Sequence, residues 1–230
     1  MPMTDPKIIV AIDTFDFQKA NAILEQLNPD LCLVKIGSVV FNALGKSFLK
    51  HASSQGFKIF LDLKLHDIPN TVHETITGFN DCKIDMLTVH LSGGEEMLKK
   101  AMLAGKSINT KVIGVSMLTS LEEEDSLALF GNNLEEQISN LFKIAFKVGI
   151  DGIVCSPHEL KIANTVLGSN SIKITPGIRD IQVEDDQART MSAKEAIERG
   201  SSFLVIGRPI TQAEDISQTL KNFNDSIYEK

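Results

Sequence analysis

Short apolar runs rich in β-branched residues recur along the whole chain, and the segments between them repeat apolar residues with the spacing of an α-helix. One such helical segment carries Leu134, Ile138, Leu141, Ala145 and Val148. Apolar runs of this length, bounded by turn residues, are typical of buried strands. The pattern therefore predicts strands at residues 8–12, 31–36, 58–65, 86–91, 111–117, 152–155, 172–175 and 203–206.

Strand and helix alternate throughout this pattern. The predicted strands begin 20 to 41 residues apart, close to the length of one strand, one turn and one helix. Such alternation implies a parallel sheet, and eight units close most naturally into a (β/α)8 TIM barrel, an α/β fold. No linker or shift in composition divides the chain, so we expect residues 1–230 to form a single barrel domain.

The longest interval, 41 residues, separates the starts of the fifth and sixth strands. It contains an acidic run at residues 122–125 and a turn-like Gly131-Asn132-Asn133. This material follows a strand at the end where barrel active sites lie, so it could form a closing loop. A solvated acidic insertion without a role fits equally well, because charge runs are usually solvated faces.

Composition narrows the classes of partner. The chain is 43% apolar and 23% charged, as in ordinary soluble proteins, and its net charge of -7 without a basic patch argues against nucleic-acid binding. No signal peptide or membrane-spanning run is evident. Cys32, Cys82 and Cys155 have no metal-ligand spacing and lie in or beside apolar segments, which predicts buried reduced thiols and a cytoplasmic protein.

The third predicted strand carries the densest candidate chemistry. Side chains alternate on a strand, so Asp62 and Lys64 are expected on one face and Leu61, Leu63 and Leu65 on the other. An isolated Asp-x-Lys is more often a structural ion pair than a reaction centre. The other strands decide between the two interpretations.

Polar residues recur where the other predicted strands end: Asp13, Lys35, His90, Ser116 and Thr119. Each alone has an ordinary structural explanation, such as a turn cap or a snorkelling lysine. The carboxyl ends of barrel strands, however, meet at one rim, where active sites are built. Four charged groups there, Asp13, Lys35, Asp62 and Lys64, would couple each other's ionisation, which favours a shared catalytic site.

The loops after the last two strands predict a phosphate site. Gly177 and Arg179 follow the seventh strand, and Gly207 and Arg208 follow the eighth. Glycine lets backbone N–H groups approach an anion, and arginine binds it through charge-assisted hydrogen bonds. These loops are the usual phosphate position of the barrel, so we expect a phosphorylated small-molecule substrate. Two tight turns with surface arginines are the alternative.

Seven segments together resemble the orotidine 5′-phosphate decarboxylase family in its shorter bacterial form, and the resemblance covers nearly the whole chain. The segment at residues 60–71, FLDLKLHDIPNT, is the most specific. The supporting segments are residues 10–13, 33–37, 89–94, 118–120, 175–179 and 205–209.

The resemblance implies decarboxylation of orotidine 5′-phosphate to UMP, the last step of de novo pyrimidine synthesis, without cofactor or metal. Lys64 would be the proton donor, with Asp62 and Lys35 as its charged catalytic neighbours. Lys35 would also contact the substrate, and Asp13 would contact the ribose. Thr119, Arg179, Gln187, Gly207 and Arg208 would hold the pyrimidine and the phosphate.

The resemblance also implies a homodimer. In the family, catalytic Asp67 and substrate-binding Ile68 and Thr71 of one subunit complete the site of the other. One short segment of this chain would then build parts of two active sites.

Three alternatives remain open from the sequence. The first is a metal-dependent decarboxylase or aldolase that acts on a sugar phosphate, which uses a similar Asp-x-Lys-x-x-Asp element. The continuation Asp67-Ile68-Pro69-Asn70-Thr71 favours the orotidine 5′-phosphate decarboxylase family instead. Lys64 or Lys35 could instead act as a Schiff-base nucleophile. A barrel that binds a phosphorylated ligand without turnover would leave Asp62 and Lys64 without a role.

Overall fold

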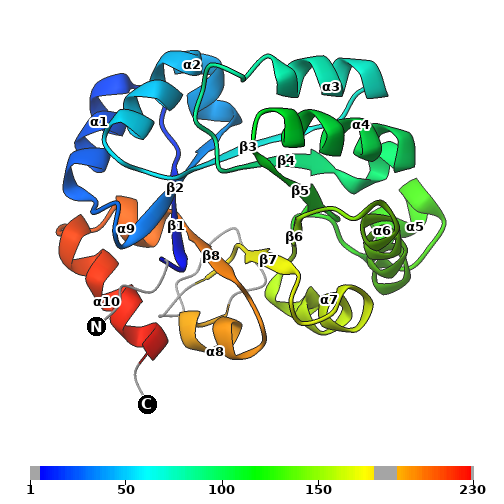
Figure 1. The fold of residues 1–230 in the computed structure, drawn as a ribbon. Helices are drawn as coiled ribbons and strands as arrows, with labels where there is room; N and C mark the ends of the chain where they lie inside the picture. Colours follow the sequence, from blue (N-terminus) through cyan, green and yellow to red (C-terminus); the bar gives the residue numbers. More distant parts are fainter. Residues whose placement is uncertain (1–5, 179–190, 229–230) are drawn as a thin grey trace.

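The computed structural model describes residues 6–178 and 191–228. Eight parallel strands form a closed barrel in sequence order, with β1 paired to both β2 and β8 (Figure 1). The predicted (β/α)8 TIM barrel is therefore confirmed. The strands are β1 Ile8–Ile12, β2 Cys32–Gly37, β3 Ile59–Leu65, β4 Met86–His90, β5 Lys111–Val115, β6 Gly152–Val154, β7 Ile172–Thr175 and β8 Phe203–Ile206.

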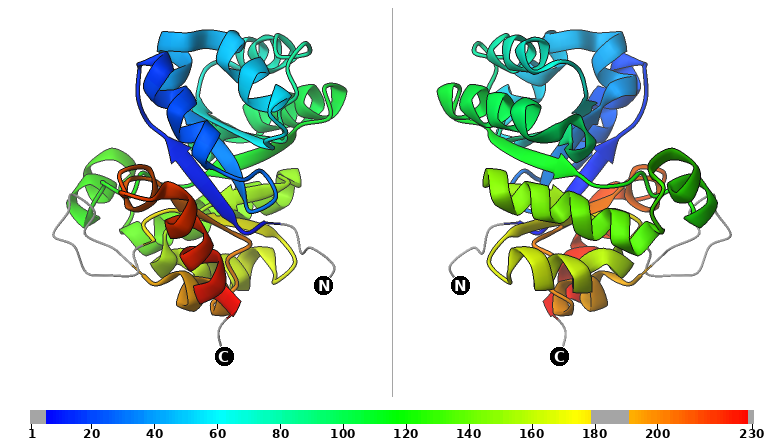
Figure 2. Two further views of the ribbon diagram at one scale, coloured as in Figure 1. Left: turned by 90° about the vertical axis from the view of Figure 1, so that its left-hand side faces the viewer. Right: turned by 90° about the vertical axis from the view of Figure 1, so that its right-hand side faces the viewer.

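Helices cover the outside of the barrel (Figure 2). They bury the helix-facing residues of the strands, for example Ile8, Val10 and Ile12 of β1. Short 3₁₀ turns occur at Leu91–Gly93 and Pro157–Glu159. The described helices are α1 Phe17–Gln26, α2 Ser38–Ser54, α3 Pro69–Thr77, α4 Gly94–Ser107, α5 Glu123–Phe130, α6 Leu134–Val148, α7 Leu160–Leu167, α8 Ala193–Glu198, α9 Arg208–Thr211 and α10 Ile216–Tyr228.

A separate small core fills the inside of the barrel. Its buried members, one from each of six strands, are Ile9, Leu33, Phe60, Met86, Ile113 and Ile174. Because side chains alternate, the residue two positions after each of these also faces inward, nearer the carboxyl end of its strand. On β2, β3 and β4 those positions are Lys35, Asp62 and Thr88. These three polar residues therefore lie next to the apolar core, on the side of the carboxyl ends of the strands.

The long interval after β5 forms two helices, α5 and α6. The backbone N–H of Glu122 donates to Asp125 Oδ2 at 3.0 Å, and Glu123 Oε2 accepts from the backbone N–H of Leu134 at 3.0 Å. Three of the four acidic side chains at residues 122–125 belong to the first turn of α5, where they interact favourably with the helix dipole. At least part of the acidic run therefore serves to start and anchor a helix.

Cys32, Cys82 and Cys155 are free and buried, as predicted. Burial raises the pKa of Cys32 to about 12, so this thiol stays protonated and unreactive. Among the helices described here, none has the length and apolar character needed to cross a membrane.

Candidate active site

A charged cluster of Lys35, Asp62 and Lys64 lies at the carboxyl ends of β2 and β3. Lys64 Nζ lies 2.9 Å from both carboxylate oxygens of Asp62, and Lys35 Nζ lies 3.4 Å from Asp62 Oδ2. A Cβ at Gly37 would lie only 3.0 Å from Lys35 Nζ, so glycine leaves room for this ammonium. The side chain of Asp62 is 11% exposed and that of Lys64 is 35% exposed. The sequence prediction that these charges meet agrees with the geometry, and Lys64 is the member most open to a ligand.

The backbone path that brings Lys64 to Asp62 differs from the expected regular strand. Lys64 has φ of +50°, in the left-handed region that residues with a Cβ rarely adopt, and the register between β3 and β4 shifts between Leu61 and Leu65. The predicted alternation nevertheless holds for the side chains: Lys64 contacts Asp62, and Leu61, Leu63 and Leu65 all belong to the outer core. The left-handed backbone and the register shift at Lys64 are the features that the sequence did not predict.

Thr88 of β4 is a buried member of the site that the sequence analysis missed. Its hydroxyl donates to Asp62 Oδ1 at 3.0 Å and accepts from the backbone N–H of Lys64 at 2.8 Å. The signal was present in the alternation, because Thr88 follows inward-facing Met86 by two residues.

Asp62 is held in its charged form. Burial by itself raises the pKa of this carboxyl, but the charges of Lys35 and Lys64 and the hydrogen bonds from Lys64 and Thr88 outweigh that effect and lower the pKa below its usual value. An ionised carboxylate at this position orients both ammonium groups and repels another anion placed beside it.

Two imidazoles lie next to the cluster. His90 ends β4, and its ring centroid lies 5.3 Å from that of His66. Burial lowers the pKa of His90, and the charges of His66 and Lys64 lower it further. His90 is therefore expected to be neutral at pH 7.

A cavity of about 460 Å³ brings five predicted residues together: Asp13, Lys35, Gly177, Gly207 and Arg208. It is also lined by Thr211 and Gln212, which the sequence analysis missed. They follow Arg208 by three and four residues, the spacing that places side chains on one face of a helical turn. Lys35 belongs to both the cavity and the charged cluster, so the cluster and the Gly207-Arg208 loop form one site.

Seven further predicted residues lie outside this cavity and the charged cluster or are not described. Asp67, Ile68, Thr71 and Thr119 are exposed, and within the described residues no ion pair joins Asp67 to Lys35 or Lys64. Ser116 directly follows β5, as expected, but its side chain is buried and donates to Glu159 Oε2 at 3.0 Å. Arg179 and Gln187 fall outside the described residues.

A family model described as "Orotidine 5'-phosphate decarboxylase / HUMPS family" matches residues 6–223. The chain belongs to this family. The resemblance that the sequence motifs indicated is thereby confirmed.

Individual relatives of this family match over nearly their whole length. An orotidine 5′-phosphate decarboxylase of Psychromonas ingrahamii is 42% identical over 98% of both chains. One of Actinobacillus pleuropneumoniae is 43% identical over 97% of this chain and 99% of its own. The crystal structure of orotidine 5′-phosphate decarboxylase from Lactobacillus acidophilus is 35% identical, with a TM-score of 0.85 over 98% of this chain and 100% of that one.

The carboxylates near the charged cluster are not placed to bind a metal ion in the part of the chain that the structure describes. Over residues 6–178 and 191–228, no group of three or more His, Cys, Asp or Glu side chains is arranged to hold a metal ion. Asp62, the carboxylate that a metal-dependent relative would use, has an ammonium on each side. Two neighbouring cations make it a poor ligand for a divalent metal.

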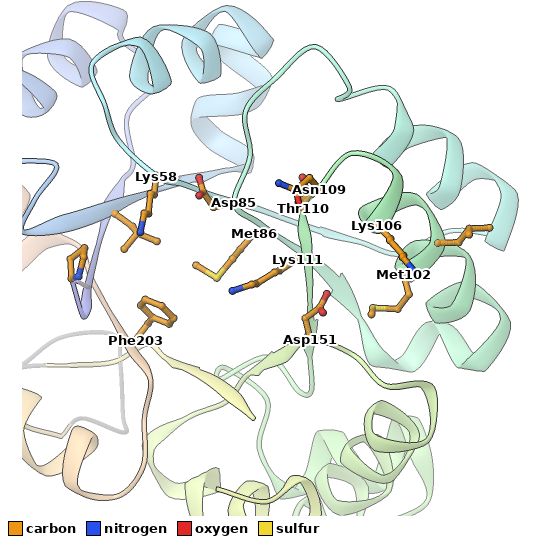
Figure 3. Close-up of a pocket in the computed structure, with 13 residues that line it drawn as sticks. Lys58, Asp85, Met86, Met102, Lys106, Asn109, Thr110, Lys111, Asp151 and Phe203 are labelled. Carbon is orange, nitrogen blue, oxygen red and sulfur yellow. The ribbon is translucent and has the colours of Figure 1, made fainter. Parts of the chain in front are cut away.

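A second cavity, of about 710 Å³, lies at the amino-terminal ends of the strands (Figure 3). Met86, Lys111 and Phe203 point into the space inside the ring of strands. Its carboxylates have structural partners: Asp85 Oδ2 accepts from the backbone N–H of Ile59 at 2.9 Å, and Asp151 Oδ2 from that of Val112 at 2.8 Å. The charged cluster lies at the other end, so we assign the active site to the smaller cavity.

Proposed function

We propose that this chain decarboxylates orotidine 5′-phosphate to UMP without a cofactor and that Lys64 donates the proton. The reaction itself, a carboxy-lyase step of pyrimidine biosynthesis, follows from the family and from relatives that share more than two fifths of their residues with the chain. The single observation that supports the mechanism is the contact of Lys64 Nζ with both oxygens of Asp62 beside a cavity lined by Arg208.

Loss of carbon dioxide leaves an electron pair in a ring orbital that the π system of the pyrimidine does not delocalise. The carbon–carbon bond to the carboxylate breaks, and the pair stays on the ring carbon. The ammonium of Lys64 stabilises this charge and then transfers its proton to that carbon. The neutral amine of Lys64 takes up a proton from solvent, to which its side chain is partly exposed.

Asp62 orients Lys64 and disfavours a substrate carboxylate that stays beside it. Both effects need the ionised form, which Lys35 and Lys64 favour. Repulsion of the substrate carboxylate raises the energy of the bound ground state and is relieved as carbon dioxide forms. The shared carboxylate thus supports both bond cleavage and proton transfer.

Arg208 and Gly207 are proposed to hold the phosphate, because both line the cavity that contains Asp13 and Lys35. Binding energy from this remote group holds the ring beside Lys64.

Arg208→Ala is expected to raise KM for orotidine 5′-phosphate about 10- to 100-fold, the effect of losing a hydrogen bond to a charged group. Steady-state kinetics measure this change. Arg208→Lys is the matched control: it keeps the charge without the planar fork and should lie between wild type and Arg208→Ala. An unchanged KM in Arg208→Ala would place the phosphate elsewhere.

We also propose a homodimer in which Asp67, Ile68 and Thr71 complete the partner's site. Ile68 is 67% exposed in the single chain, a large apolar side chain beside an exposed carboxylate. Asp67 Oδ1 accepts only a local hydrogen bond among the described residues, from the backbone N–H of Ile68 at 2.7 Å. Both features support a role toward a second copy of the chain.

We further propose that the enzyme is cytoplasmic and binds neither nucleic acid nor membrane. The buried free thiols and the net charge of -7 support this assignment.

Decarboxylation is expected to continue unchanged after treatment with a chelator. The assay follows the loss of orotidine 5′-phosphate absorbance in metal-free buffer. Activity that disappears with EDTA and returns with magnesium would favour the metal-dependent alternative. Borohydride trapping of substrate on Lys64 or Lys35 would favour a Schiff base, and tight nucleotide binding without turnover would favour a binding protein.

A further inference from the structure

We propose that Thr88 is a positioning residue for the reaction: one buried hydroxyl fixes the carboxylate of Asp62 and the backbone of Lys64 together. The inference rests on the roles proposed above for these two residues. Thr88 is fully buried, so it does not touch the substrate and acts only through its partners.

The direction of the hydroxyl follows from its two partners. A threonine hydroxyl has one proton to donate and can accept through its lone pairs. The Lys64 backbone N–H can only donate, so the hydroxyl oxygen accepts from it at 2.8 Å. The ionised Asp62 carboxylate can only accept, so the hydroxyl proton points to Oδ1 at 3.0 Å. Both bonds are satisfied at once with a single orientation.

Lys64 needs this support because its backbone is unusual. A left-handed φ is unfavourable for a residue with a Cβ, and the register shift between β3 and β4 interrupts the regular ladder at this point. The hydroxyl of Thr88 provides the acceptor for the Lys64 N–H there. In this conformation the ammonium folds back to contact both oxygens of Asp62.

Thr88→Val removes the hydroxyl and keeps the side-chain shape. It leaves the Lys64 N–H without its acceptor and removes one donor from Asp62. We expect kcat for decarboxylation to fall about 10- to 100-fold, as for a lost hydrogen bond to a charged group, with KM changed less than about threefold. Thr88→Ser keeps the hydroxyl and should retain kcat within about threefold.

The pH dependence of kcat/KM distinguishes a positioning role from a merely structural one, because loss of a structural contact alone would leave it unchanged. The groups that face Asp62 are Lys35 from β2, Lys64 from β3 and His90 from β4. A hydrogen bond to the charged carboxylate lowers its pKa, so its loss should raise that pKa. The acid limb of kcat/KM in Thr88→Val should therefore move to higher pH.

Thr110→Val is the matched control. Thr110 is also buried, and its hydroxyl donates to the backbone carbonyl of Ile84 at 2.9 Å, at the opposite end of the barrel. This variant should lose stability in urea unfolding and keep wild-type kcat and pH profile. If Thr88→Val does not fold, Thr88→Ala takes its place with the same expected loss.

The Thr88 variants and Lys64→Ala together distinguish a failure of the positioning role from a failure of the proton-donor assignment. Wild-type kcat and an unmoved acid limb in a folded Thr88→Val or Thr88→Ala, together with an inactive Lys64→Ala, would overturn the positioning role alone. An active Lys64→Ala would overturn the proton-donor assignment, whatever Thr88 does. We expect Thr88→Val to lose kcat and to move the acid limb to higher pH. We expect Thr88→Ser to restore kcat.

Discussion

Lys64→Ala is expected to lower kcat for decarboxylation by about four orders of magnitude. The substitution removes the proposed proton donor and also the cation nearest the developing negative charge. Asp62 remains paired with Lys35 at 3.4 Å, so the buried carboxylate keeps a partner. Alanine carries a Cβ as lysine does, so the left-handed backbone at this position is not additionally strained.

The measurement is single-turnover decay of orotidine 5′-phosphate absorbance, with UMP binding followed by calorimetry. The variant should fold and bind UMP, because Arg208 and Asp13, proposed to contact the phosphate and the ribose, line the cavity beside Lys64 and are unchanged. Lys64→Arg is the companion variant: it retains a cation whose proton is not released near pH 7 and should also be inactive. Near-normal turnover in Lys64→Ala would falsify the proton-donor assignment.

Asp67→Ala is expected to lose at least about a hundredfold in kcat and to regain activity when co-expressed with the inactive Lys64→Ala chain. In a mixed dimer, one barrel has an intact Lys64 and receives an intact Asp67 from its partner. Half of the dimers are mixed at equal expression and half of their sites are intact, so activity should return to about one quarter of wild type.

The control is co-expression of Lys64→Ala with Asp62→Ala. Both of these residues lie in one barrel and contact each other, so mixing their variants creates no intact site and should restore nothing. If Asp67 acts in its own subunit, its mixture with Lys64→Ala will also stay inactive. The pair of mixtures thus tests the shared site without a structure of the dimer.

The fold was predictable because its signals are local. Each strand is a short apolar run, each helix repeats its apolar residues at helical spacing, and βα units of this length leave few ways to arrange parallel strands. The same alternation placed Asp13, Lys35 and Asp62 near the carboxyl ends of their strands. Predicted boundaries were exact for β1, β7 and β8 and differed by at most two residues for the others, as for β2, expected at residues 31–36 and observed at Cys32–Gly37.

The sequence by itself determined which chemical groups stand at the rim of the barrel, because strand ends and side-chain alternation follow from residue order. Only the tertiary structure decided which of them touch. Thr88 meets Asp62 across 26 residues of sequence because β3 and β4 are neighbours whose register shifts at this point. The left-handed backbone of Lys64 departs from regular strand geometry, and Thr88 of β4 accepts a hydrogen bond from its N–H. Such contacts depend on the pairing of neighbouring strands and on the register shift between β3 and β4, which exist only in the assembled barrel.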